Sequence, residues 1–339
     1  MIAHVIFLKK EVFKMDKQLT AGGRDAYFDN AKALLIVSVV LGHTLSGMLG
    51  ETRWMDSLYM FIYTFHMPAF IFVTGYYAKV LRTKRDWWKL IKSVVLPYFI
   101  FQFLYTAYYI YVLDLSVTFN FFENLRWGLW FLVSLFCWRV LLPFFTRSKW
   151  MIVVALVISL IAGELPFINE LFSLSRTVYF FVFFIAGYHL SVDPLKKAGK
   201  IGKLVGVIVL VLIFVSMYAM NDTSWREWLF GRLPYIELEP FIFDNGMLNR
   251  LTIYMICGVA MIAFLAAVPT KKYSWTVIGQ RTMAIYLFHL AAVQTFRQLP
   301  IYEQWLQLGN YYFFFLFVFL TIAVLALPLF SKILSGKIK

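Results

Sequence analysis

Residues 28–43 read FDNAKALLIVSVVLGH and carry the pattern that decides the fold class. Asp29 and Lys32 stand near the start of this stretch, His43 closes it, and the ten residues between Lys32 and His43 hold no charge. A helix that crosses a bilayer needs about 20 mostly apolar residues. The stretch and its continuation to residue 50 therefore predict a membrane span. An ionisable group inside such a span is costly, and its presence indicates function.

The composition extends this prediction to the whole chain of 339 residues. Hydrophobic residues make up 61%, charged residues make up 15%, and the mean hydropathy is +0.73. A soluble domain carries about 25% charged residues, so a soluble enzyme, a disordered protein and a disulfide scaffold are excluded. Cys137 and Cys257 both lie in apolar runs and are interpreted as small buried side chains. The sequence therefore predicts neither a disulfide nor a metal site.

Apolar runs of span length predict an all-α integral membrane protein, a bundle of about ten transmembrane helices. Residues 1–30 are expected to form a cytoplasmic N-terminal lead, with Met15 as an alternative start, and residues 31–335 a transmembrane domain. The predicted spans are 32–50, 57–79, 93–113, 127–145, 151–168, 176–192, 204–220, 248–268, 276–296 and 311–331.

The distribution of charge predicts the orientation of these spans. One set of span ends carries 22 of the 32 lysines and arginines, whereas the opposite set carries seven arginines and no lysine. Cytoplasmic loops are enriched in Lys and Arg, so both termini are expected in the cytoplasm. The formal net charge of +14 is then a signature of membrane topology, and no nucleic-acid partner is expected.

Three histidines fall inside predicted spans: His43, His66 and His289. At a rise of about 1.5 Å per residue, they lie roughly 14 to 20 Å from the membrane edge at which each span enters. All three depths are near the middle of a hydrocarbon core about 30 Å thick. Two interpretations stay open: each ring packs between helices against a backbone carbonyl, or the three share one site.

Lys32 and His43 are eleven residues apart, which is three helical turns plus about 20°, so they share one helix face. Asp29 stands one turn before Lys32. The acid and the lysine would form a simple ion pair at the start of the helix. The alternative is that they begin a polar track from the cytoplasmic surface to His43.

Residues 79–92 read KVLRTKRDWWKLIK, with six basic residues, and are expected on the cytoplasmic side. The segment is a topology signal that lies on anionic lipid, a phosphate-binding site, or both. Lys89 and Lys92 are one turn apart and would line the mouth of the third span. No Gly-rich phosphate loop is present, which argues against an ATPase.

The opposite side carries Asn124, Arg126 and Trp130 at the start of the fourth span, and a polar interval at 221–247. Aromatic residues at such positions are usually interfacial anchors. Aromatic rings interleaved with acids and arginines are also suited to holding sugars through stacking and hydrogen bonds. Both interpretations stay open.

Several of these stretches resemble motifs of the acyltransferase 3 family of integral membrane acyltransferases, in particular its fucose 4-O-acetylase-like branch. Asp29, Lys32 and His43 match the spacing of the family's Asp-x-x-Arg and the histidine that follows it, with Lys32 in place of the arginine. Lys89 and Lys92 stand where the family has paired arginines, so charge is kept and bidentate grip on phosphate is lost. The other matching stretches are YTFHMPAFIFVTGYY, KLIKSVVLPY, RWGLWFLVSLF, YFFVFFIAGYHL and IGQRTMAIYLFHL.

The resemblance implies acetyl-CoA as the acyl donor, no permanently bound cofactor, and a carbohydrate hydroxyl as the acceptor. It implies that His43 acts as general base or acyl carrier, with His66 or His289 stabilising the oxyanion and Lys32 and Asp29 completing the catalytic set. Residues expected to hold CoA are Lys89, Lys92, Arg85 and Tyr98, and those expected to hold the acceptor are Trp130, Asn124, Arg126, His289 and Tyr286.

Some relatives carry an extracellular hydrolase-like domain after the last span, and this chain is expected to have none. Transfer to the acceptor would then occur in the membrane domain or on an extracytoplasmic partner protein, with membrane lipids as the other partners. Two alternatives stay open: a longer donor such as succinyl-CoA, and a multi-span transporter or flippase. The chain lacks the paired broken helices and the inverted repeat that are typical of transporters.

Overall fold

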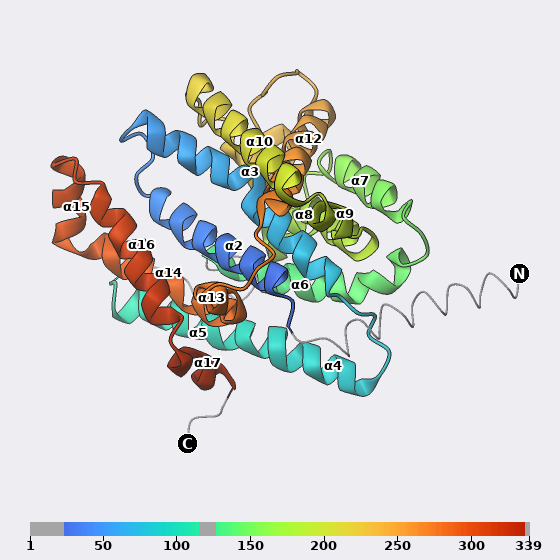
Figure 1. The fold of residues 1–339 in the computed structure, drawn as a ribbon, viewed down its shortest axis with the longest axis horizontal. Coiled ribbons are helices and arrows are strands. Elements are labelled where there is room, and N and C mark those ends of the chain that lie inside the picture. The colour runs from blue at the N-terminus through green and yellow to red at the C-terminus, as the bar shows by residue number, and fades with distance from the viewer. Residues whose placement is uncertain (1–23, 115–126, 336–339) are drawn as a thin grey trace, which may run out of the picture.

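The computed structural model describes residues 24–114 and 127–335, and this part of the chain forms helices and turns without strands. Asn124, Arg126 and most of the expected N-terminal lead lie outside the described residues. Figure 1 shows α2 and α3 at the centre, α14 to α16 on one side and α7 to α9 on the other. The longer helices are α2 (Ala26–Leu45), α3 (Arg53–Tyr76), α5 (Leu96–Tyr111), α6 (Trp130–Leu141), α7 (Met151–Ala162), α8 (Leu174–His189), α10 (Gly199–Met220), α12 (Gly246–Ala267), α14 (Thr282–Gln298) and α16 (Tyr312–Leu325).

Short helical pieces connect or extend these ten helices. A π-helical segment, η1, joins α4 to α5, and short 3-10 segments lie directly before α6, after α6 and before α8. The shorter elements are α4 (Lys84–Leu90), η1 (Ile91–Val95), η2 (Trp127–Leu129), η3 (Leu142–Phe145), η4 (Leu171–Ser173), α9 (Asp193–Lys197), α11 (Arg226–Phe230), η5 (Tyr235–Glu237), α13 (Thr276–Gln280), α15 (Pro300–Gln307) and α17 (Pro328–Ser335).

Each of the ten predicted spans overlaps a helix, but the helices are not equally suited to cross a membrane. Six are long and apolar enough: α2, α3, the continuous helix Lys84–Tyr111, the helix Leu171–His189, α10 and α12. The bent pair α16 and α17, which meet at 58° where Pro328 begins a new helix, would make a seventh. Trp130–Phe145 and α7 are shorter apolar helices. The chain is thus a multi-pass helical protein, and the count of ten spans stays a prediction.

Three predicted boundaries are wrong, each because a local signal extends or interrupts a helix. α2 begins at Ala26, since the Asp25 side chain accepts a hydrogen bond from the Tyr27 amide and caps the helix. Residues 84–92, expected as a loop, are helical, because Thr83 and Asp86 form a capping box. The span predicted at 276–296 is broken at Arg281 into α13 and α14.

Glycines bring the central helices into backbone contact. A Cβ added to Gly75 on α3 would lie 2.0 Å from the Phe184 carbonyl oxygen, and one added to Gly187 on α8 would lie 2.0 Å from that of Phe72. Small residues allow this close approach in membrane helices. At the other end of the pair, Tyr63 on α3 is in electrostatic range of Arg176 on α8. α3 and α8 therefore run in the same direction.

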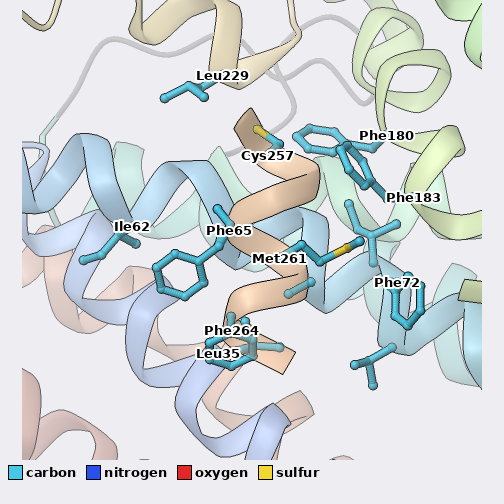
Figure 2. Close-up of a cluster of buried hydrophobic side chains, with 14 of the residues drawn as sticks. Leu35, Ile62, Phe65, Phe72, Phe180, Phe183, Leu229, Cys257, Met261 and Phe264 are labelled. Carbon is cyan, nitrogen blue, oxygen red and sulfur yellow. The ribbon is translucent and has the colours of Figure 1, made fainter. Parts of the chain in front are cut away.

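The largest apolar cluster fills the space between α2, α3, α8 and α12. Figure 2 shows Phe65 and Leu35 on one side of α12 and Phe180 and Phe183 on the other. The rings of Phe65 and Phe264 stack with centroids 5.2 Å apart. Cys257 is buried in this cluster and both cysteines are free. This packing fixes the positions of α2 and α3, which carry His43 and His66.

Candidate active site

The rings of His43 and His289 lie next to each other, although they come from helices far apart in the sequence. His43 stands in the last turn of α2 and His289 in the middle of α14, with ring centroids 5.2 Å apart. His289 is completely buried, and His43 is half-buried. His66 on α3 is buried and lies within electrostatic range of His43. The structure thus brings together the three histidines for which the sequence left a shared site open.

Packing between α2 and α3 sets the height of these rings. A Cβ added to Gly42 would lie 3.2 Å from the Tyr63 ring, so the two helices meet at that level. The short connection at 46–52 makes them antiparallel, which puts His66 about one turn, roughly 5 Å, from His43 toward the start of α2. His43 lies only two residues before the end of α2, because the helix starts and ends earlier than predicted.

Hydrogen bonds to the backbone determine which nitrogen of His66 and His289 carries the proton. Nδ1 of His66 is 2.8 Å from the Ile62 oxygen, and Nδ1 of His289 is 2.8 Å from the Tyr286 oxygen. A carbonyl oxygen only accepts, so each Nδ1 donates and each Nε2 carries the lone pair. In this neutral tautomer neither ring has an N–H to offer an oxyanion, the role expected for one of them.

Arg297 and Tyr302 hold the end of α2 beside His43. Nη2 of Arg297 donates to the His43 carbonyl oxygen at 2.5 Å and to Ser46 Oγ at 2.8 Å. The Tyr302 hydroxyl donates to the Gly47 carbonyl oxygen at 2.8 Å. The last carbonyls of a helix lack hydrogen-bond donors within the helix. Arg297 and Tyr302 supply such donors at the end of α2. Arg297 is one of the seven arginines on the side predicted to face outward, and the clue to its role was its place two turns after His289.

Three arginines and two glutamates form a network near the start of α8, on the side predicted to face outward. One of the arginines, Arg226, lies 3.6 Å from Glu227. Arg232 donates to both oxygens of Glu227, at 2.6 and 2.9 Å, and to Glu170 at 3.2 Å. Arg176 is 4.0 Å from the same oxygen of Glu170. Burial disfavours the charge on Arg232, but its hydrogen bonds to Glu227 prevail and raise the pKa of this guanidinium. Arg176 is also within electrostatic range of His43, so the network adjoins the histidines.

Two residues expected to hold the acceptor are engaged within the protein. Trp130 is 9% exposed; its ring stacks on Phe180 at 5.3 Å, and the Arg176 guanidinium lies 5.2 Å from its centroid. Tyr286 lies one turn before His289 and donates its hydroxyl to the Gly128 carbonyl oxygen. Trp130 thus orients Arg176, and Tyr286 ties the start of α6 to α14.

Asp29 and Lys32 form the ion pair that the sequence left as one of two alternatives. Lys32 Nζ lies 2.7 Å from an Asp29 oxygen, and the buried carboxylate also accepts from Gln280 at 3.0 Å. Arg24 is 3.6 Å from the other Asp29 oxygen. Three side chains thus satisfy the carboxylate, which anchors α13 to α2.

The helix face between Lys32 and His43 is apolar. Ile36 and Val39 occupy it, and both are buried in a cluster with residues of α14 and α16. A continuous polar track along this face is therefore interrupted. Any group that travels from the start of α2 to His43 must pass apolar side chains.

The basic segment expected to hold CoA is an exposed helix. Lys89, Arg85 and Lys92 are all exposed, and Nζ of Lys92 lies 5.9 Å from the centre of the Trp88 ring. Tyr98 is buried one and a half turns further along. Lys92 stands within η1, and single π-helical turns inside α-helices are frequent at functional sites. The segment follows the end of α3, the end of that helix opposite to the arginine–glutamate network.

Arg139 is a further cation near this segment, and it was not among the predicted site residues. It stands on α6, which packs against η1, and its Nη2 donates to the Lys79 carbonyl oxygen at 2.8 Å. Its Nε is buried and has no hydrogen-bond partner among residues 24–114 and 127–335. The Asp86 carboxylate lies within electrostatic range of the Arg139 guanidinium.

Apolar helices around a pair of histidine rings, one buried and one half-buried, define a multi-pass membrane protein with a polar site in its interior. The family model described as "Acyltransferase domain" matches residues 25–329. The chain therefore belongs to the acyltransferase 3 family, and it is an O-acyltransferase. Membership of an enzyme family argues against the transporter alternative.

Two curated relatives cover most of the chain. The Nodulation protein NolL of Sinorhizobium fredii is 25% identical over 321 residues, which are 84% of this chain and 82% of the relative. The Nodulation protein NolL of Mesorhizobium japonicum is 22% identical over 306 residues, 83% of this chain and 80% of the relative. No solved structure matches the chain.

Proposed function

We propose that the chain moves an acetyl group from cytosolic acetyl-CoA to a hydroxyl of a cell-surface or lipid-linked carbohydrate. The observation that carries this proposal is the ring pair of His43 and His289, placed in the interior of an acyltransferase-family domain. A basic helix lies toward one set of helix ends and a polar network toward the other. Donor and acceptor would approach the pair from opposite sides of the membrane.

The distance from the basic segment to the histidines favours a donor with a long, narrow arm. α3 ends at Tyr76, whereas the level of His43 is that of Tyr63, thirteen residues away along α3. At about 1.5 Å per residue this is roughly 20 Å. Phosphates of CoA would bind Lys89, Lys92 and Arg85 at the surface, and the extended pantetheine arm would carry the thioester inward between apolar side chains.

The arginine–glutamate network favours an acceptor rich in hydroxyls. Arg176, Arg226 and Arg232 pair with Glu170 and Glu227, so guanidinium donors and carboxylate acceptors lie side by side. Such a group offers both donors and acceptors of charge-assisted hydrogen bonds, which suits the hydroxyls of a sugar. Asn124 and Arg126 belong to the same proposed acceptor side.

The chemistry at His43 follows one of two routes. As general base, neutral His43 takes the proton of the acceptor hydroxyl while its oxygen attacks the thioester carbon and the C–S bond breaks. As acyl carrier, His43 attacks the thioester itself and then passes the acetyl group to the hydroxyl. In both routes CoA leaves as a thiolate and recovers one proton.

The proposed topology is ten spans in the cell membrane with both termini in the cytoplasm. The parallel direction of α3 and α8 agrees with it, since both are predicted to enter from outside. In a chain whose two native cysteines are replaced by Ser, a cysteine at Glu237 should react with an impermeant thiol reagent from outside, and one at Lys197 should not. The reverse labelling would contradict the orientation.

The function is tested by deleting the gene and comparing O-acetyl esters on surface glycans by mass spectrometry. We expect one class of ester to disappear, to return with the wild-type chain, and to remain absent with the His43→Gln variant. An unchanged set of esters would contradict a carbohydrate acceptor. An extracytoplasmic partner protein would be indicated if purified enzyme needs a membrane extract for transfer.

A further inference from the structure

One ring nitrogen of His289 donates a hydrogen bond, and the other is an acceptor that receives none from the residues that the structure describes. Nδ1 lies 2.8 Å from the Tyr286 oxygen and 3.1 Å from the Ile285 oxygen, so it carries the proton and is spent on the helix backbone. Nε2 is then a lone-pair acceptor. It is buried and has no hydrogen-bond partner among the residues that the structure describes.

An unsatisfied buried nitrogen is costly and calls for an explanation. Leaving a buried acceptor without a donor costs about 1–3 kcal/mol, and most buried polar atoms in proteins have a partner. His66 is held in the same way through Nδ1, but its Nε2 is not among the unsatisfied buried atoms. Of these two rings, His289 is therefore the one whose Nε2 can still accept a hydrogen bond.

The exposure of the two paired rings indicates what each can receive. His43 is half-buried, so part of the residue is open to a reactant, whereas His289 has no exposed surface. With ring centroids 5.2 Å apart, a group that reaches His289 must come to it beside His43. The smallest reacting group with a proton to donate is the acceptor hydroxyl.

We propose that His43 carries the acetyl group and that Nε2 of His289 receives the proton of the acceptor hydroxyl. This inference rests on the proposed acetyl transfer and assigns the two steps to two residues. His289 is then a second catalytic residue, with the backbone bond at Nδ1 keeping its lone pair in place.

The two steps balance. First, a His43 nitrogen attacks the thioester carbon: the C–N bond forms, the C–S bond breaks, and CoA leaves as a thiolate from an acetylimidazolium. Next, the hydroxyl oxygen attacks the same carbon. The C–O bond forms, the hydroxyl proton passes to His289 Nε2, and the electron pair of the C–N bond returns to His43. The imidazolium of His289 finally releases the proton that matches the thiolate.

The test separates the two steps by following radiolabelled acetyl-CoA in membranes of the deletion strain that contain the full-length chain and the natural acceptor. Label on the protein reports the first step, and label on glycans reports the second. His289→Gln keeps a hydrogen-bond acceptor near Nε2 but no base, and His289→Asn keeps the Nδ1-side bond and lacks Nε2. His189→Gln is the matched control, since Nε2 of His189 bonds the Phe145 carbonyl at the far end of α8, away from the paired rings.

We expect both His289 variants to keep or increase label on the protein and to lose glycan label by about 10²- to 10⁴-fold. The KM for acetyl-CoA should stay unchanged, which a merely structural role would not predict for both variants. His43→Gln should lose both labels, and His189→Gln should resemble wild type.

Each other outcome overturns part of the scheme. Wild-type glycan transfer by His289→Gln, or loss of protein label in both His289 variants at normal thermal stability, would overturn the role of His289. Glycan label without any protein label in wild type would overturn the acyl-carrier step and leave acetyl transfer standing. Absence of both labels in wild type would overturn the proposed function itself.

Discussion

α2 and α10 are apolar helices of 20 and 22 residues with opposite surroundings. In α2, 67% of the apolar window is buried inside the protein, whereas in α10 the share is 11%, although α10 is the more apolar helix. α2 holds Asp29, Asn30 and His43, and the first two have side-chain partners in α13. Lipid accepts apolar side chains but satisfies no polar group. Of these two helices, the more apolar one therefore lies at the outside of the protein, and the one that carries polar side chains lies inside.

His43→Gln should have the largest effect, because α2 supplies the interior with a reactive side chain. Glutamine retains most of the volume and a hydrogen bond but accepts no proton near neutral pH, so turnover should fall by about 10²- to 10⁴-fold. The thermal stability in detergent should change little. Acetyl transfer is measured with radiolabelled acetyl-CoA, and substantial transfer by the folded variant would remove His43 from the mechanism.

Leu35→Ala in α2 and Leu212→Ala in α10 test the comparison directly with one chemical change. Leu35 is 0% exposed and Leu212 is 60% exposed. Truncating a buried leucine costs about 2–5 kcal/mol, whereas a surface change is usually within about 0.5 kcal/mol. Thermal unfolding in one detergent should therefore separate the two variants. Equal loss would mean that α10 is buried against another chain or subunit.

Lys92→Ala tests an exposed residue that is proposed to bind a phosphate of CoA. A charge-assisted contact with a CoA phosphate is worth about 1.5–3 kcal/mol, so the KM for acetyl-CoA should rise by about 10- to 150-fold. Lys92→Arg should keep most of the activity, because charge is retained. An unchanged KM in the folded alanine variant would leave the segment only as a topology signal.

Gly75→Ala and Gly258→Ala sharpen the comparison at the level of a single methyl group. The methyl at 75 would overlap the Phe184 carbonyl oxygen, while that at 258 would meet nothing within 4 Å. Overpacking of this kind costs about 1–3 kcal/mol, so only Gly75→Ala should lower the unfolding temperature. A stable Gly75→Ala chain would show that α3 and α8 adjust to each other.

Much of the fold was predictable because the apolar content of each segment indicates whether that segment forms a membrane helix. Composition excluded a soluble protein, and each predicted span overlaps a helix. The errors fall where capping overrides hydropathy: Asp25 starts α2 early, and Thr83 with Asp86 makes the basic segment helical. Hydropathy says little about these positions, since a cap is a local hydrogen bond.

The candidate site was predictable only in part. The residue types and depths pointed to His43, His66 and His289, and the structure places these rings together. Arg297 was missed, since nothing in its own neighbourhood distinguishes it from other arginines on the same side. Its place two turns after His289 was a clue, but its link to His43 spans 254 residues of chain and becomes visible only when α14 packs on α2.

The amino-acid sequence alone determined that the protein is helical and built for a membrane, because transfer into lipid depends on the apolar residues of one segment at a time. It also predicted which ionisable groups lie inside the apolar segments. Tertiary structure decided that His43 faces His289, that Ile36 and Val39 interrupt the polar face of α2, and which nitrogen of His289 is spent on the backbone. These outcomes depend on packing between helices, which no single segment encodes.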